Sequence, residues 1–334
     1  MNPPYQITPE ILKLITSISE KIGHINAKFL DKPSPKLRKE NRIKTIHSSL
    51  SIEGNTLTEE QITALIEDKR IIGPEKDVNE VLNAIKVYGQ LQAFNFNSIK
   101  SFLNAHEILM LGLVPDNGKF RKKGVGIMAG NKIAHMAPPA ENVPHLMNDL
   151  FAYIKTSKEI TLIKSCVFHY EMEFIHPFID GNGRMGRLWQ TLILMEEYPV
   201  FEFIPFENII HKTQREYYHA LAKSDKSGNS TPFIKYMLNV INDALYNMLD
   251  FKSRIMSTED RLTYFSEIVK SEFSRKDYMS VFKDISSATA SRDLKKGVEL
   301  GLFDKEGDKT KTIYRIINSR NISNRCTTTP LKNN

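Results

Sequence analysis

One short stretch near the middle of the chain concentrates residue types that handle phosphate. It reads His-Pro-Phe-Ile-Asp-Gly-Asn-Gly-Arg-Met-Gly-Arg over residues 176–187. Periodicity places it between a predicted helix that ends near Ile175 and another that begins near Gly183. The first amides of a helix are unpaired and lie at the positive end of its dipole, and glycines let an anion approach them closely. The stretch therefore predicts a site for a phosphate-bearing ligand.

Four charged or titratable side chains in this stretch add chemistry to that site. Arg184 and Arg187 lie three residues apart on the second helix and place positive charge over its start. Asp180 is a suitable ligand for a Mg²⁺ ion that a bound polyphosphate shares. His176 supplies a group that takes up a proton near neutral pH. Each residue alone is more often structural, but their concentration in one loop favours function.

Other phosphate and metal motifs do not fit the stretch. A P-loop is excluded because no Gly-x4-Gly-Lys-Ser/Thr is present. An EF-hand would place Arg184 at its fifth position and would lack the closing glutamate. His169 and His176 are seven residues apart without a nearby cysteine pair, which argues against zinc.

The elements that must position this loop are predicted to be mainly helical. Thr58 and Gln61 form a predicted capping box that opens one helix. Two short segments around Ala129-Gly130-Asn131, over 125–128 and 132–136, predict a β-hairpin. Apolar residues at spacings of three and four predict the other helices, over about 8–30, 36–52, 77–94, 98–111, 143–153, 159–175, 183–197 and 231–254.

Beyond Met256 the predicted elements are three short helices and a β-ribbon. The helices cover 260–273, 275–283 and 287–300, and the strands cover 301–303 and 312–316. This order is typical of a winged helix-turn-helix.

The third helix of this unit carries the features of a recognition helix. With Ser287 as its N-cap, its basic face presents Arg292, Lys295 and Lys296, while Leu294, Val298 and Leu300 are expected to turn inward. Lys305, Lys309, Lys311 and Arg315 of the wing are expected to contact a nucleic-acid backbone. The interpretations left open are duplex DNA binding, protein docking and dimerisation.

The chain has 334 residues, 46 of them basic and 39 acidic, and a formal charge of +7. Residues 251–334 hold 17 basic and 11 acidic side chains, against 29 and 28 in residues 1–250, so nearly all the excess lies at the C-terminal end. Two cysteines exclude a disulfide framework and fit a reducing compartment. The chain begins without a signal-like segment and has no long apolar run, which predicts a cytoplasmic protein that does not enter a membrane.

The loop over 176–187 resembles the signature of Fic-domain proteins, His-x-Phe-x-Asp/Glu-Gly-Asn-Gly-Arg-x-x-Arg, at every specified position. The resemblance implies a Fic-type helical bundle with a β-hairpin flap. It also implies transfer of AMP from ATP to a hydroxyl side chain of a protein, with release of pyrophosphate. The predicted hairpin lies where the family has its flap, and the C-terminal unit resembles winged-helix modules found behind Fic domains.

The resemblance assigns roles to the charged residues of the loop. His176 would be the general base that deprotonates a Ser, Thr or Tyr hydroxyl of the target. Asp180 would ligate the Mg²⁺ between the α- and β-phosphates. Arg184 would contact the β-phosphate and Arg187 the γ-phosphate.

The uncharged residues of the loop also take roles from the family. Gly181, Asn182 and Gly183 would form an anion hole through their amides, and Phe178 would be a buried anchor. The family's kinase-like branch carries lysine in place of Gly183, so the glycine favours AMP transfer.

A second motif lies upstream. Residues 49–55, Ser-Leu-Ser-Ile-Glu-Gly-Asn, resemble the family's inhibitory motif Ser/Thr-x-x-x-Glu-Gly/Asn in its N-terminal form. Ser49 and Glu53 are four apart and share one helix face, with Glu53 expected in the last turn. The resemblance names Arg187 as the partner of Glu53, which would keep this arginine from the γ-phosphate.

Together these observations predict an autoinhibited, Mg²⁺-dependent protein adenylyltransferase that uses ATP. The same enzyme is a candidate for removing AMP, and a homodimer is a further expectation from the family. The alternatives are a DNA-binding regulator with a nucleotide-sensing Fic domain, or a transferase for another nucleotide or phosphocholine. The expected divisions are an N-terminal helical region over 1–95, the Fic domain over 96–254, the winged helix over 255–320 and a frayed tail over 321–334.

Overall fold

The computed structural model describes residues 3–29, 35–129, 132–251, 258–269, 272–282, 285–307 and 312–317. The described residues of Met1–Pro33 and Arg38–Phe251 form one compact unit, and those of Ser34–Leu37 and Lys252–Asn334 form a second. The predicted tail over 321–334, Lys309 and Lys311 of the wing, and the hairpin residues Gly130 and Asn131 lie outside the described residues. The division at 95 and 96 stays a prediction.

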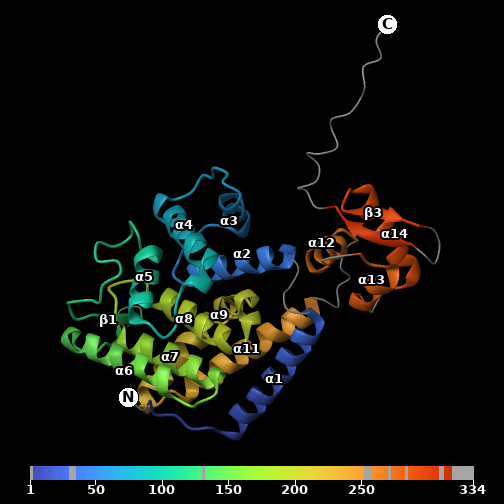
Figure 1. Ribbon diagram of the computed structural model, residues 1–334. Coiled ribbons are helices and arrows are strands. Elements are labelled where there is room, and N and C mark those ends of the chain that lie inside the picture. Colours follow the sequence, from blue (N-terminus) through green and yellow to red (C-terminus); the bar gives the residue numbers. More distant parts are fainter. Residues whose placement is uncertain are drawn as a thin grey trace. The chain divides into compact units, whose positions relative to one another are not determined.

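The first unit is built from helices and one two-stranded hairpin (Figure 1). Short 3-10 turns, η1 (Leu91–Ala93), η2 (Ala140–Asn142) and η3 (Pro199–Phe203), lie between them. The helices are α1 (Pro9–Phe29), α2 (Pro35–Ser51), α3 (Glu59–Ile66), α4 (Glu75–Gly89), α5 (Ile99–Leu109), α6 (Val143–Thr156), α7 (Thr161–Ile175), α8 (Asn182–Glu197), α9 (Glu207–Lys212), α10 (Gln214–Ser227) and α11 (Thr231–Phe251). Helix α2 belongs to this unit from Arg38 onward.

Helices α7 and α8 form the centre of this unit. They pack against each other, and α11 packs on α7 and on α1 (Figure 1). Side chains around nearly the whole circumference of α7 are buried, as expected of a helix without a one-sided apolar stripe. The loop between α7 and α8 is therefore carried by the two best-packed helices.

The predicted capping box and hairpin are both present. Thr58 caps α3, with its side chain accepting from the amide of Gln61 while Gln61 accepts from the amide of Thr58. Strands β1 (Gly126–Ala129) and β2 (Lys132–Met136) pair antiparallel, with an irregularity in register between Ile127 and Met128.

Helices α9 and α10 were not predicted, because no element was expected between residues 198 and 230. Helix α10 packs on α11 and also contacts β2. Its buried residues Tyr217, Ala220 and Ser224 are spaced three and four apart, which is the signal that could have revealed it.

The second unit contains α12 (Thr258–Ile268), α13 (Arg275–Val281), α14 (Ser287–Glu299), β3 (Phe303–Glu306) and β4 (Ile313–Ile316). The two strands pair antiparallel. This is the predicted order of elements, and its assignment as a winged helix stays a prediction. Its core is formed by Leu262, Phe265, Phe273, Tyr278, Ala290, Leu294 and Phe303.

Three details of the prediction for this unit were wrong. Phe273 is not helical but exchanges backbone hydrogen bonds with Tyr314, which adds a bridge beside β4. The N-cap of α14 is Ser286, whose side chain accepts from the Thr289 amide. Leu300 is 50% exposed, because the helix ends there and Phe303 packs instead against Gly297.

None of the helices in the described ranges has an apolar stretch long enough to cross a bilayer.

A buried carboxyl group on α9 predicts a pH-dependent stability. Burial raises the pKa of Glu207 to about 8, against opposing contributions from the helix backbone, Arg187 and Thr45. Between pH 4.5 and about 8 the unfolded chain therefore binds fewer protons than the folded chain, and the free energy of unfolding falls as the pH rises. The variant Glu207→Gln has no carboxyl group at this position, so its free energy of unfolding does not fall in this way. The free energy of unfolding of the variant minus that of wild type should therefore increase by about 3 kcal/mol between pH 5 and pH 8.

Chemical denaturation at both pH values measures this difference. Glu171, whose pKa burial raises to about 7, titrates in both proteins and cancels in the comparison. If the free energies of unfolding of Glu207→Gln and wild type differ by the same amount at both pH values, Glu207 is not a neutral buried acid.

Candidate active site

The loop over 176–187, which is predicted to bind phosphate, connects α7 to α8 through two left-handed residues. His176 caps the C-terminus of α7 with φ 50°, and its amide donates to the Met172 carbonyl. Gly181 caps the N-terminus of α8 with φ 87°, a conformation that glycine adopts without steric cost. Helix α8 thus begins at Asn182, one residue earlier than predicted, and presents its first amides to the loop.

The side chain of Asn182 closes the loop from within. Its Oδ1 accepts from the Phe178 amide and its Nδ2 donates to the Phe178 carbonyl, both at 2.9 Å. Asn182 was predicted to act through its main-chain amide, so this role of its side chain was missed. Phe178 is fully buried, as predicted, and stacks on His106 with 3.5 Å between ring centroids.

His106, on α5, holds the loop from behind and was not identified from the sequence. Its Nδ1 accepts from the Gly118 amide, so Nε2 carries the proton and donates to the Asp180 carbonyl at 3.0 Å. Burial lowers the pKa of His106 to about 4, which keeps the ring neutral in this tautomer at physiological pH. The group acts as a fixed hydrogen-bond donor.

Arg121 fastens the other end of the loop. Its Nε donates to the His176 carbonyl at 2.7 Å, and its amide donates to the Pro177 carbonyl at 2.9 Å. One Nη donates to the carbonyl of Pro138, just beyond the hairpin. Arg121 is buried, and its Nε, Nη1 and Nη2 all donate to backbone carbonyl groups, so its guanidinium is engaged by the main chain. No sequence pattern around it indicated this role.

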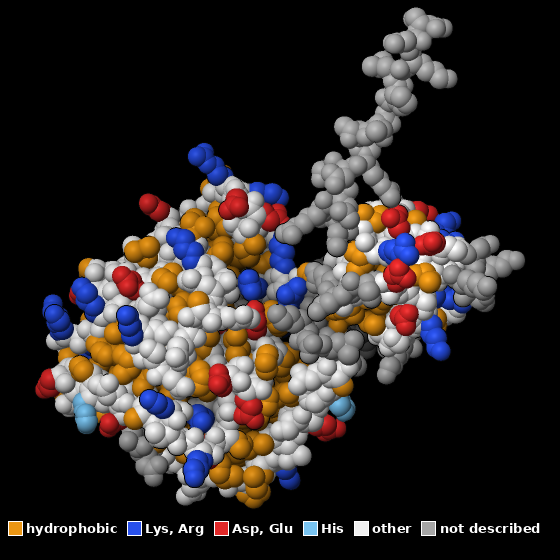
Figure 2. Space-filling model, in the orientation of Figure 1, with side chains coloured by type: hydrophobic (Ala, Val, Ile, Leu, Met, Phe, Trp, Pro, Cys, Tyr) orange, Lys and Arg blue, Asp and Glu red, His pale blue; other side chains and the backbone are white. Residues whose placement is uncertain are grey.

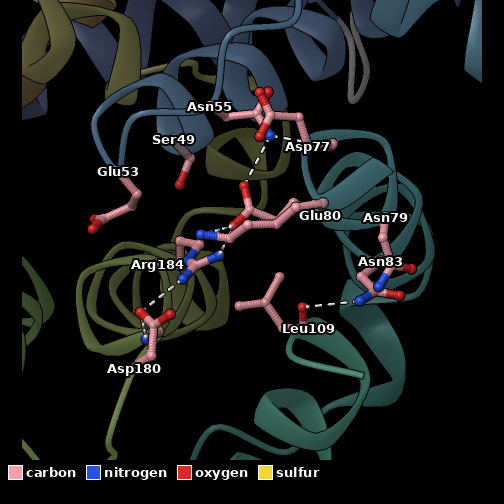
Figure 3. Close-up of polar contacts among 12 residues, drawn as sticks. Ser49, Glu53, Asn55, Asp77, Asn79, Glu80, Asn83, Leu109, Asp180 and Arg184 are labelled. Atoms are coloured by element: carbon pink, nitrogen blue, oxygen red, sulfur yellow. Dashed lines mark hydrogen bonds and ion pairs between the residues drawn. The ribbon is translucent and has the colours of Figure 1, made fainter. Parts of the chain in front are cut away.

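Arg184 is held between two carboxylates. Its Nη1 lies 3.2 Å from Glu80 Oε1 and its Nη2 lies 3.0 Å from Asp180 Oδ1 (Figure 3). The side chain of Arg184 is 4% exposed, that of Glu80 7%, and that of Asp180 47%. The acidic partner at the surface is therefore the residue predicted to ligate Mg²⁺, and the buried one, Glu80 on α4, was not predicted.

The residues present fit a Mg²⁺ ion that is shared with phosphates. No cluster of three or more His, Cys, Asp or Glu side chains able to hold a metal occurs in the described part of the chain. Mg²⁺ commonly binds through one or two carboxylates and the oxygens of a substrate. The half-exposed carboxylate of Asp180, beside the start of α8, meets that requirement.

Arg187 is fully buried and contacts Ser49 and Glu53, the two residues predicted to form an inhibitory motif. Its Nε donates to Ser49 Oγ at 3.1 Å, and its Nη2 donates to the Ser49 carbonyl and to Glu53 Oε1, both at 2.8 Å. Burial alone would lower the pKa of Arg187, but the charges of Glu53, Tyr217 and Glu173 raise it overall. The pair that the resemblance named is therefore present, with Ser49 as a second partner.

Glu53 lies just beyond α2 and against the start of α8. Helix α2 ends at Ser51, and the Glu53 amide donates to the Leu50 carbonyl in the turn that follows, so Glu53 is not in the last helical turn as predicted. A Cβ atom at Gly183 would overlap Glu53 Oε1 and approach Arg187 Nη1 to 3.0 Å. The carboxylate is unfavourable at the end of its own helix, but it occupies the favourable positive end of α8.

A buried polar network links α7, α8 and α10. His169 on α7 contacts Gln190 at 2.6 Å through Nδ1 and the Tyr217 hydroxyl at 3.0 Å through Nε2. Burial lowers the pKa of His169 to about 3, so the ring is neutral. Tyr217 comes from α10, and the network was missed because that helix was missed.

The second unit exposes the three residues predicted to contact DNA. Arg292, Lys295 and Lys296 are all exposed on α14. Arg315, however, pairs with Glu272 at 2.7 Å and with Glu306 at 2.9 Å. On the face in Figure 2, acidic side chains are interspersed with basic ones on this unit. DNA binding stays a prediction.

Comparison with known proteins places the chain in a family. The model of the Fic/DOC family matches residues 96–194. The crystal structure of a Fic family protein from Desulfovibrio desulfuricans G20 is 39% identical, covers 95% of this chain and 98% of its own, and superimposes with a TM-score of 0.73. The chain belongs to the Fic family. Its mainly helical fold with a β-hairpin is the Fic fold.

More distant Fic proteins carry names that describe an activity. Protein adenylyltransferase Fic of Drosophila erecta is 28% identical over 219 residues, which are 62% of this chain and 42% of that protein. The corresponding protein of Drosophila mojavensis is 26% identical over 259 residues. The chain thus spans less than half the length of these relatives. A Fic-1 structure from C. elegans shares the fold at 20% identity, 72% coverage of both chains and a TM-score of 0.59.

Proposed function

We propose that this Fic protein is an adenylyltransferase that moves AMP from ATP to a hydroxyl group of a protein and is inhibited by its own Glu53. The observation that carries the proposal is the pair of buried arginines at the start of α8, 3% and 0% exposed, each held by a carboxylate. Buried guanidinium groups beside a helix N-terminus suit a polyphosphate. The names of the Drosophila relatives support AMP as the transferred group.

The chemistry assigned to the loop is a nucleotidyl transfer. His176 accepts the proton of the target hydroxyl, whose oxygen bonds to the α-phosphorus of ATP as the bond from that phosphorus to pyrophosphate breaks. The products are a protein-linked AMP ester, pyrophosphate and a proton on His176. The amides of Asn182 and Gly183 are assigned to the phosphate oxygens, since such transfers depend mainly on positioning and electrostatics. The Gly181 amide, predicted for the same role, donates to Asp180 Oδ1 at 2.6 Å in this structure.

The remaining charges orient the leaving group. Arg184 is assigned to the β-phosphate and Arg187 to the γ-phosphate. Asp180 would hold Mg²⁺, which neutralises phosphate charge when it is bound. His106 positions Asp180, and Arg121 positions His176, because each donates a hydrogen bond to the main-chain carbonyl of that residue.

Glu53 acts as the inhibitor in this proposal by competing for Arg187. It occupies the Nη2 donor of Arg187, the residue assigned to the γ-phosphate, and it lies against Gly183, where an anion would approach the helix start. Removal of AMP from a modified target is a second activity proposed for the same glutamate.

The donor is tested by offering ATP, GTP, UTP and CDP-choline, each with Mg²⁺, to the Glu53→Gly protein together with candidate protein acceptors. Intact-mass spectrometry should show the addition of AMP from ATP, and no comparable product from the other donors. A product of a different mass would still indicate a transferase but would identify another donor. The absence of any product from all four would contradict the proposed function.

A further inference from the structure

Glu80 lies between the loop and the turn over 52–55 that follows α2, called the inhibitory turn because it carries Glu53. Its Oε1 accepts from Arg184 Nη1 at 3.2 Å, and its Oε2 accepts from Asn55 Nδ2 at 2.8 Å (Figure 3). Lys76 is a third, outer partner at 3.9 Å. Glu80 is 5% exposed, so it is directed at these protein groups and not at solvent.

The Asn55 side of this contact is rigid. Besides Glu80, Asn55 Nδ2 donates to the Asp77 carbonyl at 3.1 Å, and Oδ1 accepts from the Leu57 amide at 3.1 Å. Asn55 is 8% exposed, and its amide orientation is set by these three bonds. Thr56 adds two bonds to the Asp77 carboxylate, at 2.9 Å and 2.6 Å. The turn after Glu53 is thereby fastened to the first two turns of α4.

The orientation of the Arg184 guanidinium depends on Glu80. Of the two carboxylates on Arg184, Asp180 is half exposed and has a second role assigned to it, whereas Glu80 is buried. Arg184 Nε is buried and has no hydrogen-bond partner in the described part of the chain. When Asp180 is engaged by a ligand, Glu80 is the charged partner that keeps the guanidinium in place.

We propose that Glu80 is a positioning residue that orients Arg184 toward the β-phosphate and, through Asn55, couples it to the inhibitory turn. One turn then contacts both arginines of the loop: Arg187 directly through Glu53, and Arg184 indirectly through Asn55 and Glu80. A displacement of the turn changes both phosphate contacts together. The proposal rests on the function proposed above, because it assigns the β-phosphate to Arg184.

Nucleotide affinities separate this positioning role from a general loss of structure. In the Glu53→Gly protein, the second change Glu80→Gln removes the charge and turns an amide donor toward Asn55 or Arg184. We expect the affinity for ADP and ATP with Mg²⁺ to fall about tenfold, the scale of one charge-assisted hydrogen bond. The affinity for AMP, which has no β-phosphate, should change by less than about twofold.

The matched control is Glu75→Gln, which makes the same charge change at an exposed position in the first turn of α4. It should leave all three affinities unchanged. Asn55→Ala should also weaken the binding of ADP and ATP. The double variant Asn55→Ala/Glu80→Gln should bind both nucleotides no more weakly than Glu80→Gln alone.

The affinities are measured by competition against a fluorescent ATP analogue, with melting temperatures recorded for each variant. Equal affinities in the Glu80→Gln and Glu75→Gln proteins would overturn the proposal, and so would an equal loss for AMP, ADP and ATP. If the Glu53→Gly protein itself binds no ATP, it is the proposed function that fails.

Discussion

The Glu53→Gly protein is expected to transfer AMP at least about tenfold faster than the wild-type chain. Arg187 is fully buried and directs Nη2 to Glu53 Oε1 at 2.8 Å, so removing the carboxylate returns a charged donor to an incoming phosphate. A charge-assisted hydrogen bond contributes about 1.5–3 kcal/mol, which corresponds to roughly tenfold to a hundredfold. The measurement is the initial rate of labelled AMP incorporation from ATP with Mg²⁺.

Glu53→Gln separates the two ways in which Glu53 acts. Glutamine keeps the bulk against Gly183 but loses the charge that Arg187 attracts. If charge pairing dominates, Glu53→Gln should approach the activity of Glu53→Gly. If the bulk over the helix start dominates, it should remain close to wild type. Wild-type activity in both variants would mean that Glu53 is not an inhibitor.

The second large effect is expected at His176. In the Glu53→Gly background, His176→Ala should lower the transfer rate by about 10²–10⁴-fold, the range for loss of a general base. The affinity for ATP should remain within about twofold, because the phosphate contacts assigned to the loop come from other residues. Initial rates and nucleotide binding, measured on the same preparation, test both parts.

His145→Ala is the matched control for this experiment. His145 lies on α6 with a side chain 79% exposed, and its neighbour is Asp149 at 3.7 Å. This variant should transfer AMP at the rate of its Glu53→Gly parent. A His176→Ala protein that keeps more than about a tenth of the parent rate would remove His176 from the role of base.

Much of the candidate site could be predicted because its signals are local. The loop over 176–187 is contiguous in sequence, and so is the motif over 49–55. The capping box of Thr58 and Gln61 involves residues three apart, and the hairpin strands are separated by two residues. Propensity and periodicity act over these same short separations, which is why the positions of these elements were predicted to within a few residues.

The supporting residues could not be predicted, because each acts across a long separation. His106 reaches Asp180 over 74 residues, and Arg121 reaches His176 over 55. Glu80 and Arg184 are 104 residues apart. Each of these side chains, read alone, is an ordinary polar residue on a helix or in a loop. Only the packing of α4, α5 and the segment after α5 beside the loop gives these side chains their partners.

The position of Glu53 shows both what the sequence could predict and what only the folded structure decides. The sequence by itself placed Glu53 near the end of the helix predicted over 36–52, and Arg184 and Arg187 on the first turns of the helix predicted to begin near Gly183. A carboxylate at the C-terminal end of a helix is unfavourable because the helix dipole is negative there. The tertiary structure decided that this carboxylate lies at the start of a different helix, against Gly183 and beside Arg187. The reason is physical: local preferences place a charge on a helix, but long-range packing decides which partner it meets and how far water is excluded from the pair.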